Sequence, residues 1–204
     1  MNGLSRQPFT VVRAPALNIG KITALLRRGF HDEPVQQWLF PRSMCRTVLN
    51  GLWFRELAAA GLREGTIWCL GDYSAGAIWF QPDPDGQTVR KQKLLDLCLA
   101  INPRAKRSKQ ELDRALAMRR PTTPHWYLAA VATAFSLRGQ GRGRSVLLPA
   151  LGICDETGRQ AYLETATPNS LRFYESLGFR ICDSFRLPNG PQIWCLERLP
   201  RRGV

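Results

Sequence analysis

The chain has 204 residues, a length typical of one domain, and a domain of this size buries about 70 % of the surface that its unfolded chain exposes. Lysine and arginine number 29 against 16 aspartates and glutamates, so the net charge of +13 makes an anionic ligand or a nucleic acid a partner to consider. The six cysteines are widely separated and form no Cys-x-x-Cys pair, which argues against a zinc site and against a small disulfide framework.

The first half of the chain combines strand patterns with helical patterns. Asn18 offers a helix cap, and apolar residues then recur at helical spacing as far as Phe30. A later helical pattern stops near Gly61, and two β-rich runs follow it around a turn-rich linker. The expected elements are a strand at 9–12, helices at 18–30 and 44–60, and a hairpin of strands 66–70 and 75–80.

The second half alternates helices and strands. Helices are expected at 89–101 and 108–119, a strand from Trp126 to Val131, and a helix over 143–157 that continues with a kink through Pro149. That helix is expected to bury one apolar face, which consists of Leu147, Leu148, Leu151 and Cys154. A strand at 162–165, a helix capped by Thr167 and ending at Leu177, and strands at 181–187 and 192–196 complete the pattern.

These elements predict a single α/β (α+β) domain over 1–204, with a mixed, mostly antiparallel sheet flanked by helices. No apolar run approaches the ~20 residues of a membrane span, and the N-terminus lacks the apolar core of a secretory signal. We therefore expect a soluble, cytoplasmic protein.

A glycine-rich loop lies between the strand at Trp126 and the helix that follows it. It reads Arg138-Gly139-Gln140-Gly141-Arg142-Gly143 and is followed by Arg144. Three glycines let the backbone adopt positive φ and approach a ligand, so that N–H groups converge on an anion at a helix N-terminus. The three arginines add positive charge, and the loop is interpreted as a phosphate-binding site.

The spacing of this loop distinguishes between known phosphate-binding patterns. Ser145 and Val146 stand where a dinucleotide fingerprint would need its third glycine, and no Gly-Lys-Ser or Gly-Lys-Thr closes a nucleoside-triphosphate loop. The pattern that remains is Arg-x-x-Gly-x-Gly. A glycine-rich turn with solvated arginines stays open as the alternative on this motif alone.

A second motif follows in the chain, from Leu163 to Phe179, and ends in Tyr174-x-x-x-Gly178-Phe179. Together the two motifs resemble the GCN5-related N-acetyltransferase (GNAT) family, in which the first grips the pyrophosphate of coenzyme A. The closing stretch Gly-Pro-x-x-Trp-Cys-x-x-Arg at 190–198 is similar to the puromycin N-acetyltransferase branch of that family. The resemblance implies the GNAT fold, with six to seven strands, and acetyl-CoA as cosubstrate without a metal.

The resemblance also implies the residues that contact the cosubstrate. Main-chain groups at the end of the Trp126 strand would pair with its pantetheine arm, and the loop would hold its phosphates. Thr133 and Thr167 depart from the family pattern, so the contribution of nearby Asn169 is open. The implied cofactor-binding residues are Val131, Ala132, Thr133, Arg138, Gly139, Gln140, Gly141, Arg142, Gly143, Arg144 and Asn169.

Direct acetyl transfer needs a neutral amine, a stabilised carbonyl oxygen and a proton for the leaving sulfur. Tyr174 matches the family tyrosine that serves the sulfur, and we expect it to act as general acid. Glu164 shares a strand face with Tyr162 and is the candidate general base, although a structural carboxylate bound to an arginine explains it equally well. His125 is the second candidate base, and His31 is a weaker one.

The expected acceptor is the primary amine of a small molecule, a puromycin-like aminoacyl nucleoside or another amine. Trp38 and Ala130 are the residues expected to contact it, and Phe40 and Trp53 are further aromatic candidates. A protein or peptide N-acetyltransferase and a non-catalytic coenzyme A-binding regulator remain alternatives. We do not expect nucleic acid as a partner despite the basic charge, because no nucleic-acid-binding motif accompanies it, and the choice between monomer and homodimer stays open.

Overall fold

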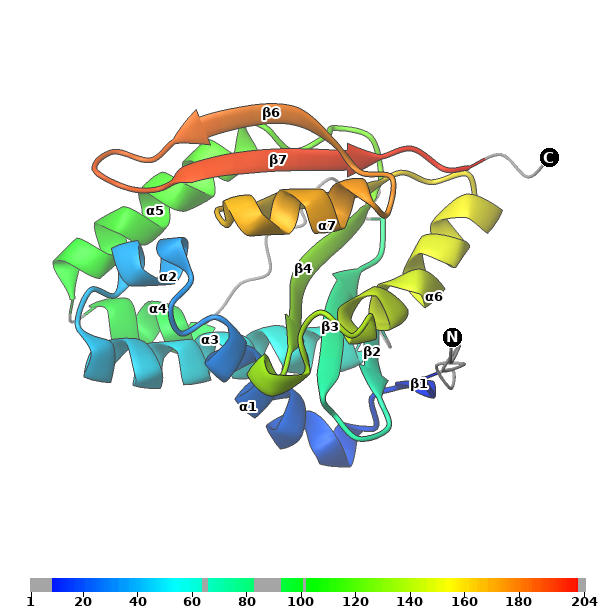
Figure 1. Ribbon diagram of the computed structural model, residues 1–204. Helices are drawn as coiled ribbons and strands as arrows, with labels where there is room; N and C mark the ends of the chain where they lie inside the picture. Colours follow the sequence, from blue (N-terminus) through cyan, green and yellow to red (C-terminus); the bar gives the residue numbers. More distant parts are fainter. Residues whose placement is uncertain (1–8, 64–65, 83–92, 101, 202–204) are drawn as a thin grey trace.

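The computed structural model describes residues 9–63, 66–82, 93–100 and 102–201 (Figure 1). The strands are β1 Val11–Arg13, β2 Ile67–Leu70, β3 Ala75–Phe80, β4 Trp126–Thr133, β5 Ala161–Thr165, β6 Arg180–Arg186 and β7 Gln192–Arg198. The α-helices are α1 Ile19–Gly29, α2 Pro34–Leu39, α3 Ser43–Arg63, α4 Lys93–Ala100, α5 Pro103–Ala117, α6 Arg142–Glu156 and α7 Leu171–Glu175, and the short 3-10 helices are η1 Ala16–Asn18, η2 Phe135–Leu137 and η3 Pro168–Ser170.

The seven strands form one sheet in the order β1-β2-β3-β4-β5-β7-β6. Within the described residues, β4 and β5 are the one parallel pair, and all other neighbours run antiparallel. The prediction of a mixed, mostly antiparallel sheet flanked by helices is confirmed. The antiparallel neighbours β3 and β4 are joined by the long segment 81–125, which contains α4 and α5, although a tight turn suffices for such a connection.

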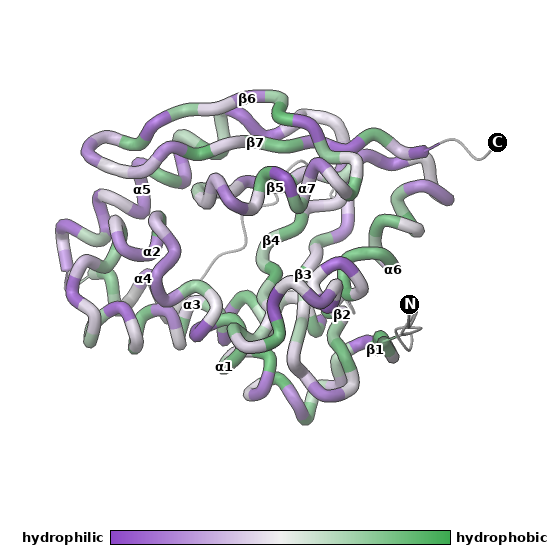
Figure 2. Tube along the Cα trace, viewed as in Figure 1, coloured by the Kyte–Doolittle hydropathy of each residue, from purple (hydrophilic) through white to green (hydrophobic). Residues whose placement is uncertain are grey.

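Two apolar clusters cover the two faces of this sheet. Alternate residues of β3 point to opposite faces, so that Ala77 and Trp79 pack with α6 and α7, whereas Ile78 and Phe80 pack with α1 and α3. A third cluster joins α2, α4 and α5 to the turn between β6 and β7. Figure 2 shows the apolar residues of β4 running through the centre of the molecule, where both main clusters meet.

A β-bulge interrupts β4 at Ala129. Ile78 of β3 pairs with Ala130 and the next residue, Trp79, pairs with Leu128, so Ala129 is the extra residue. A bulge shifts the alternation of side chains and bends the strand. Leu128 therefore packs in the α6–α7 cluster, whereas Ala130 and Ala132 pack in the α1–α3 cluster. This bulge was not predicted from the sequence.

Several local predictions need correction. Leu148 of α6 is 47 % exposed, and the buried face instead consists of Val146, Leu147, Ala150, Leu151 and Cys154. Helix α6 does continue through Pro149. Asn18 is the last residue of η1 and the N-cap of α1, and Thr167 is the N-cap of η3, but neither side chain makes a capping hydrogen bond, because the short 3-10 turns change the entry of the chain into these helices. Of the helix predicted at 89–101, the part 89–92 and residue 101 lie outside the described residues.

Two helix starts escaped the sequence analysis, although local signals exist for both. Helix α2 begins at Pro34, and Glu33 Oε2 accepts hydrogen bonds from the amides of Val35 and Gln36. Helix α5 begins at Pro103, five residues earlier than predicted, with the Asn102 side chain as its cap. An acidic or amide side chain followed by proline is a known helix-start signal, which these two segments share.

A buried ion pair ties the end of α6 to the end of β7. The Arg198 guanidinium donates to both carboxylate oxygens of Asp155, at 2.8 and 2.7 Å, and its Nε donates to Leu177 O at 3.0 Å. Arg198 is 4 % exposed. The hydrogen bond from Arg198 is the main cause that lowers the pKa of Asp155 below its ordinary value.

Substitution of Asp155 by Asn should lower the free energy of unfolding at pH 7 by about 2 kcal/mol, because the buried guanidinium loses its counter-charge. The folded-state pKa of Asp155 is depressed, so this stabilisation is present above the unfolded pKa of about 4 and disappears as the pH falls through the folded value. Urea unfolding at pH 7 and pH 3 measures the difference. Glu156→Gln, an exposed neighbour, is the control and should change stability by less than about 0.5 kcal/mol; an equal loss in both variants contradicts the prediction.

Candidate active site

The parallel strands β4 and β5 diverge soon after they meet. They pair at Trp126–Ala161 and Tyr127–Tyr162, although β4 continues to Thr133 and β5 to Thr165. On their outer sides, β4 stays paired with β3 to Thr133 and β5 with β7 to Thr165. The pairing ends at Tyr127, two residues before the bulge at Ala129, and beyond this point the N–H and C=O groups of β4 that face β5 lack a partner strand.

The glycine-rich loop leads from the end of β4 into α6. Gly139 (φ 74°) and Gly141 (φ 86°) are left-handed, and Gly141 is the N-cap of the 15-residue helix. A Cβ added at Gly139 would meet nothing within 4 Å, so open space faces the loop there. The first amides of a helix lack intrahelical partners and lie at the positive end of its dipole. This geometry suits phosphate oxygens, as the sequence predicts.

The arginine side chains of the loop have partners outside it. The Arg142 guanidinium binds Asp72 Oδ2 at 2.7 Å and Ser74 Oγ in the β2–β3 turn, and Arg144 Nη1 donates to Ser176 O at 3.2 Å. The Arg138 guanidinium lies over the Phe135 ring, and Gln140 is exposed. Arg142 and Arg144 thus fix the start of α6 in place, which leaves the backbone amides of the loop as the groups available to an anion.

Tyr174 of α7 packs on the same face of the sheet as α6. Its ring lies 5.2 Å from that of Phe173 and 5.9 Å from that of Phe179, and the residue is 8 % exposed. Its hydroxyl makes no hydrogen bond to the described residues. Burial raises the pKa of Tyr174 well above its ordinary value, so the phenol keeps its proton at neutral pH. The Tyr174 phenol is therefore protonated and has no hydrogen-bond acceptor among the described residues.

Glu164 belongs to a polar cluster at the start of the gap. Arg120 Nε donates to Glu164 Oε1 at 2.9 Å, and Arg120 Nη2 donates to the Tyr127 hydroxyl at 3.0 Å. The side chains of Arg120 and Glu164 are only 15 % and 8 % exposed. Tyr127 packs against the α1–α3 cluster, whereas Leu163, the strand neighbour of Glu164, packs in the α6–α7 cluster. Glu164 and Tyr174 therefore lie on opposite faces of the sheet at the gap.

The two histidines differ in their surroundings. His125 is 4 % exposed, its Nδ1 lies 2.8 Å from Thr123 O, and its Nε2 is buried without a partner. Burial lowers the pKa of His125, so the ring is neutral at neutral pH. His31 is half-buried and lies 3.5 Å from Ser43 Oγ. Across the described ranges no group of three His, Cys, Asp or Glu side chains is arranged to hold a metal ion.

The two predicted acceptor residues lie in different apolar clusters, Ala130 in the α1–α3 cluster and Trp38 beside the third cluster at the turn between β6 and β7. Ala130 is buried in its cluster, and Trp38 Nε1 donates to Pro188 O at 3.2 Å, so α2 contacts the turn between β6 and β7. A Cβ added at Gly190 would meet the Trp38 ring at 2.8 Å. Asn169 is exposed at η3 and is not brought to the loop by any contact in the described part of the chain. Among the helices in the described part of the chain, none is long and apolar enough to cross a membrane.

The sequence analysis missed two polar residues. Arg120 lies 44 positions before Glu164, and nothing in the basic stretch around it distinguishes it from its neighbours. Asn50 of α3 is fully buried, and neither atom of its amide has a partner. It lies one turn from Arg46, which binds Phe40 O, and one turn from Phe54, which contacts Phe30. An asparagine within a helical apolar face is the signal that was available for it.

Comparison with known proteins places this geometry in context. The model of the acetyltransferase (GNAT) family matches residues 31–179. Three solved structures are similar over nearly all of both chains. The first is a Corynebacterium glutamicum protein described as histone acetyltransferase HPA2 and related acetyltransferase, with 20 % identity, coverage of 97 % of this chain and 99 % of that chain, and a TM-score of 0.68. The second is the arylalkylamine N-acetyltransferase 2 of Aedes aegypti, with 12 % identity, coverage of 95 % and 99 %, and a TM-score of 0.63. The third is an agmatine N-acetyltransferase, with 12 % identity, coverage of 95 % and 100 %, and a TM-score of 0.61. At these identities the structural likeness shows a shared fold.

Substitution of Arg120 by Met should destabilise the protein by about 3 kcal/mol, because it leaves the buried Glu164 carboxylate without its cation. The double variant Arg120→Met/Glu164→Gln should recover most of that loss. Arg119→Met is the matched control, since Arg119 pairs with the half-exposed Asp183 and should cost less than about 1 kcal/mol. Chemical denaturation of the three variants checks this; the prediction is wrong if the double variant is no more stable than Arg120→Met.

Proposed function

Because the chain belongs to the GNAT acetyltransferase family, we propose that it transfers the acetyl group of acetyl-CoA to the primary amine of a small molecule by direct attack. The observation that carries the proposal is the gap between β4 and β5, with Tyr174 on one face of the sheet and Glu164 on the other. A donor that enters from the α6–α7 face and an amine that enters from the α1–α3 face meet within this gap.

The residues present fit acetyl-CoA. The amides of Gly139, Gln140 and Gly141, together with those of the first turn of α6, would hold its pyrophosphate. Main-chain groups of Val131 and Ala132 would pair with the pantetheine arm along the free edge of β4, and Thr133 lies beside Gly143 at the start of the loop. When bound, acetyl-CoA supplies an activated thioester. The remaining chemistry is proton transfer by side chains.

In our proposal Tyr174 donates a proton to the leaving sulfur. Its buried phenol is protonated at neutral pH and makes no hydrogen bond to another described side chain. Glu164 accepts the proton of the amine, directly or through water, because its side chain lies at the start of the gap on the α1–α3 face, where Arg120 Nε holds Oε1. His125 is less suited to this task, since its Nδ1 is held at Thr123 O and its Nε2 is buried.

The acceptor class rests on the α1–α3 face. The buried Asn50 amide has free hydrogen-bonding atoms there, and Trp38 offers an aromatic surface beside the turn between β6 and β7. The C-terminal likeness to puromycin N-acetyltransferase says less about the acceptor than about the fold, because Gly190 packs under Trp38, Cys195 is buried and Arg198 binds Asp155. We propose a small-molecule amine, with an aminoacyl nucleoside as the first member to test and a peptide N-terminus as the alternative.

Thiol release from acetyl-CoA over a panel of puromycin, arylalkylamines, agmatine and short peptides tests this function. We expect turnover with at least one small amine. Tyr174→Phe should lower kcat by about 10²-fold or more with little change in the Kd of acetyl-CoA, because the hydroxyl acts in the transfer step. Absence of turnover from folded protein over the whole panel, together with tight acetyl-CoA binding, would indicate a regulator instead.

Gly139→Glu should weaken acetyl-CoA binding by more than about 10²-fold, because the side chain fills the open space of the loop and places a negative charge there. Gly158→Glu is the matched control. Gly158 is also left-handed (φ 64°) with nothing within 4 Å of an added Cβ, but it lies beyond the other end of α6. Calorimetric titration with acetyl-CoA should show the loss only at Gly139, and an equal loss at both positions falsifies this assignment of the loop.

A further inference from the structure

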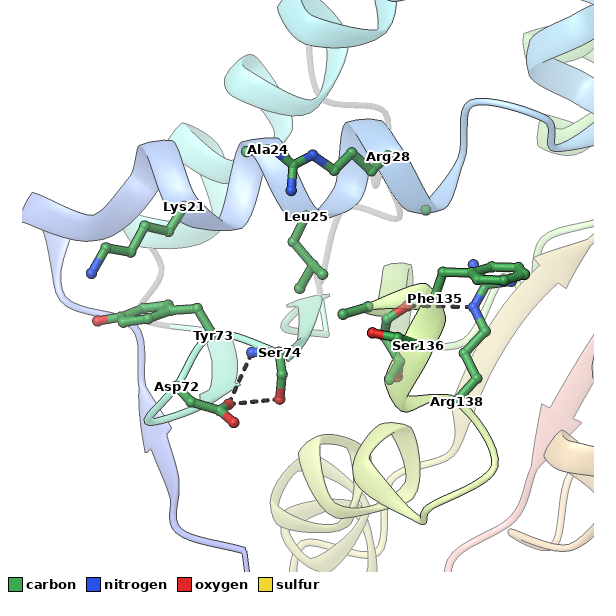
Figure 3. A pocket seen from close by; sticks show the side chains of 13 residues that line it. Lys21, Ala24, Leu25, Arg28, Asp72, Tyr73, Ser74, Phe135, Ser136 and Arg138 are labelled. Carbon is green, nitrogen blue, oxygen red and sulfur yellow. Dashed lines mark hydrogen bonds between the residues drawn. The ribbon is translucent and has the colours of Figure 1, made fainter.

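A pocket of about 730 Å³ lies outside the gap between β4 and β5. It is bounded by α1, by the β2–β3 turn and by the segment that follows β4 (Figure 3). None of its described lining residues belongs to β5 or α7, so it is separate from Tyr174 and Glu164. At its inner end it shares Thr133 and Arg138 with the entrance to the glycine-rich loop. Its volume is in the range of pockets that hold small ligands.

One face of α1 supplies the first wall of this pocket. Lys21, Ala24, Leu25 and Arg28 follow one another at spacings of three, one and three, which places them on a single side of the helix. Both charged residues are exposed at the protein surface. Figure 3 shows these side chains lying opposite the β2–β3 turn and η2. The wall therefore combines an apolar centre with a cation at each end.

The cations of the pocket outnumber the available anions. Asp72 is the acid among the lining residues, and its carboxylate is already bound by Arg142 and by Ser74. Lys21 Nζ lies 4.6 Å from the centre of the Tyr73 ring, and the Arg138 guanidinium lies 5.2 Å from that of Phe135. The Arg28 guanidinium has no hydrogen bond or ion pair with any residue that the structure describes. A free guanidinium in a cationic pocket favours an anion.

The apolar and aromatic side chains of the pocket indicate which kind of molecule would carry this anionic group. Phe135 of η2 is 84 % exposed, although it is large and apolar, and it lines the pocket with its ring turned toward Arg138 (Figure 3). Leu25 and Ala134 provide apolar surface between Phe135 and Tyr73. A planar ring can pack against these side chains while an attached anionic group reaches Arg28 and Lys21.

We propose that this pocket binds a small planar molecule that bears a phosphate or carboxylate group, and that it does so independently of acetyl-CoA. The anion lies between Arg28 and Lys21, and the ring lies against Leu25 and Tyr73. The site does not depend on the proposed acetyl transfer, because neither Tyr174 nor Glu164 lines the pocket, and the anion is held by Arg28 and Lys21 rather than by Thr133 and Arg138, which the pocket shares with the loop.

Calorimetric titration of the full chain with phenyl phosphate at low salt tests the site, and benzoate tests whether a carboxylate serves as well. Arg28→Gln should weaken binding at least tenfold, since a charge-assisted hydrogen bond is lost. Arg27→Gln, the adjacent α1 arginine outside the pocket lining, is the matched control and should change Kd less than twofold. Saturating acetyl-CoA should leave the Kd of phenyl phosphate within twofold of its value without acetyl-CoA.

Each outcome decides the proposal. Loss of binding in Arg28→Gln alone, without displacement by acetyl-CoA, supports it. Three results overturn it: no binding of either anion, equal weakening in both arginine variants, or displacement by acetyl-CoA, which would make the pocket part of the cosubstrate site. Because Arg28 is exposed, thermal unfolding should be unchanged in its variant, and because no readout uses turnover, failure of this site leaves the proposed transferase function untouched.

Discussion

The extra residue at Ala129 is the constraint on which the rest of the site depends. Because the bulge turns the side chains that follow it to the other face, Ala130 and Ala132 pack under α1 and α3, and β4 bends away from β5. Each strand keeps its outer partner, so the sheet remains continuous while its middle opens. A gap lined by main chain is thereby built into the sheet, close to the point where the glycine-rich loop begins.

The positive charge of the chain has several separate uses. Arg198, Arg142 and Arg120 each bind a carboxylate of a distant segment, and they join α6 to β7, the glycine-rich loop to the β2–β3 turn, and the segment before β4 to β5. A guanidinium can make several hydrogen bonds in a fixed plane, which suits it to such junctions. A charge of +13 therefore does not by itself indicate a nucleic-acid partner, since these arginines act within the fold.

Local sequence signals predicted most elements and also explain the misses. The order of strands and helices, the loop at Arg138–Gly143 and the continuation of α6 through Pro149 follow from periodicity, glycines and a family pattern, and the structure agrees. Leu148 was misassigned because a helix with apolar residues at adjacent positions allows two neighbouring faces, and only the packing against β2 and β3 selects one. The start of α2 was missed although Glu33-Pro34 signals it.

The sequence by itself determined most of the strand and helix order, the position of the glycine-rich loop and the choice of Tyr174 as the candidate acid, because these depend on residues close together in the chain. Only the tertiary structure decided which groups meet: Arg120 with Glu164 across 44 positions, Arg142 with Asp72 across 70, and Lys21 and Arg28 with Arg138 around one pocket. The bulge at Ala129 is also decided by the tertiary structure, because it arises from the pairing of β4 with β3. The physical reason is that such contacts depend on packing between distant segments. A run of small residues such as Ala129-Ala130 contains no local sequence signal that predicts a bulge.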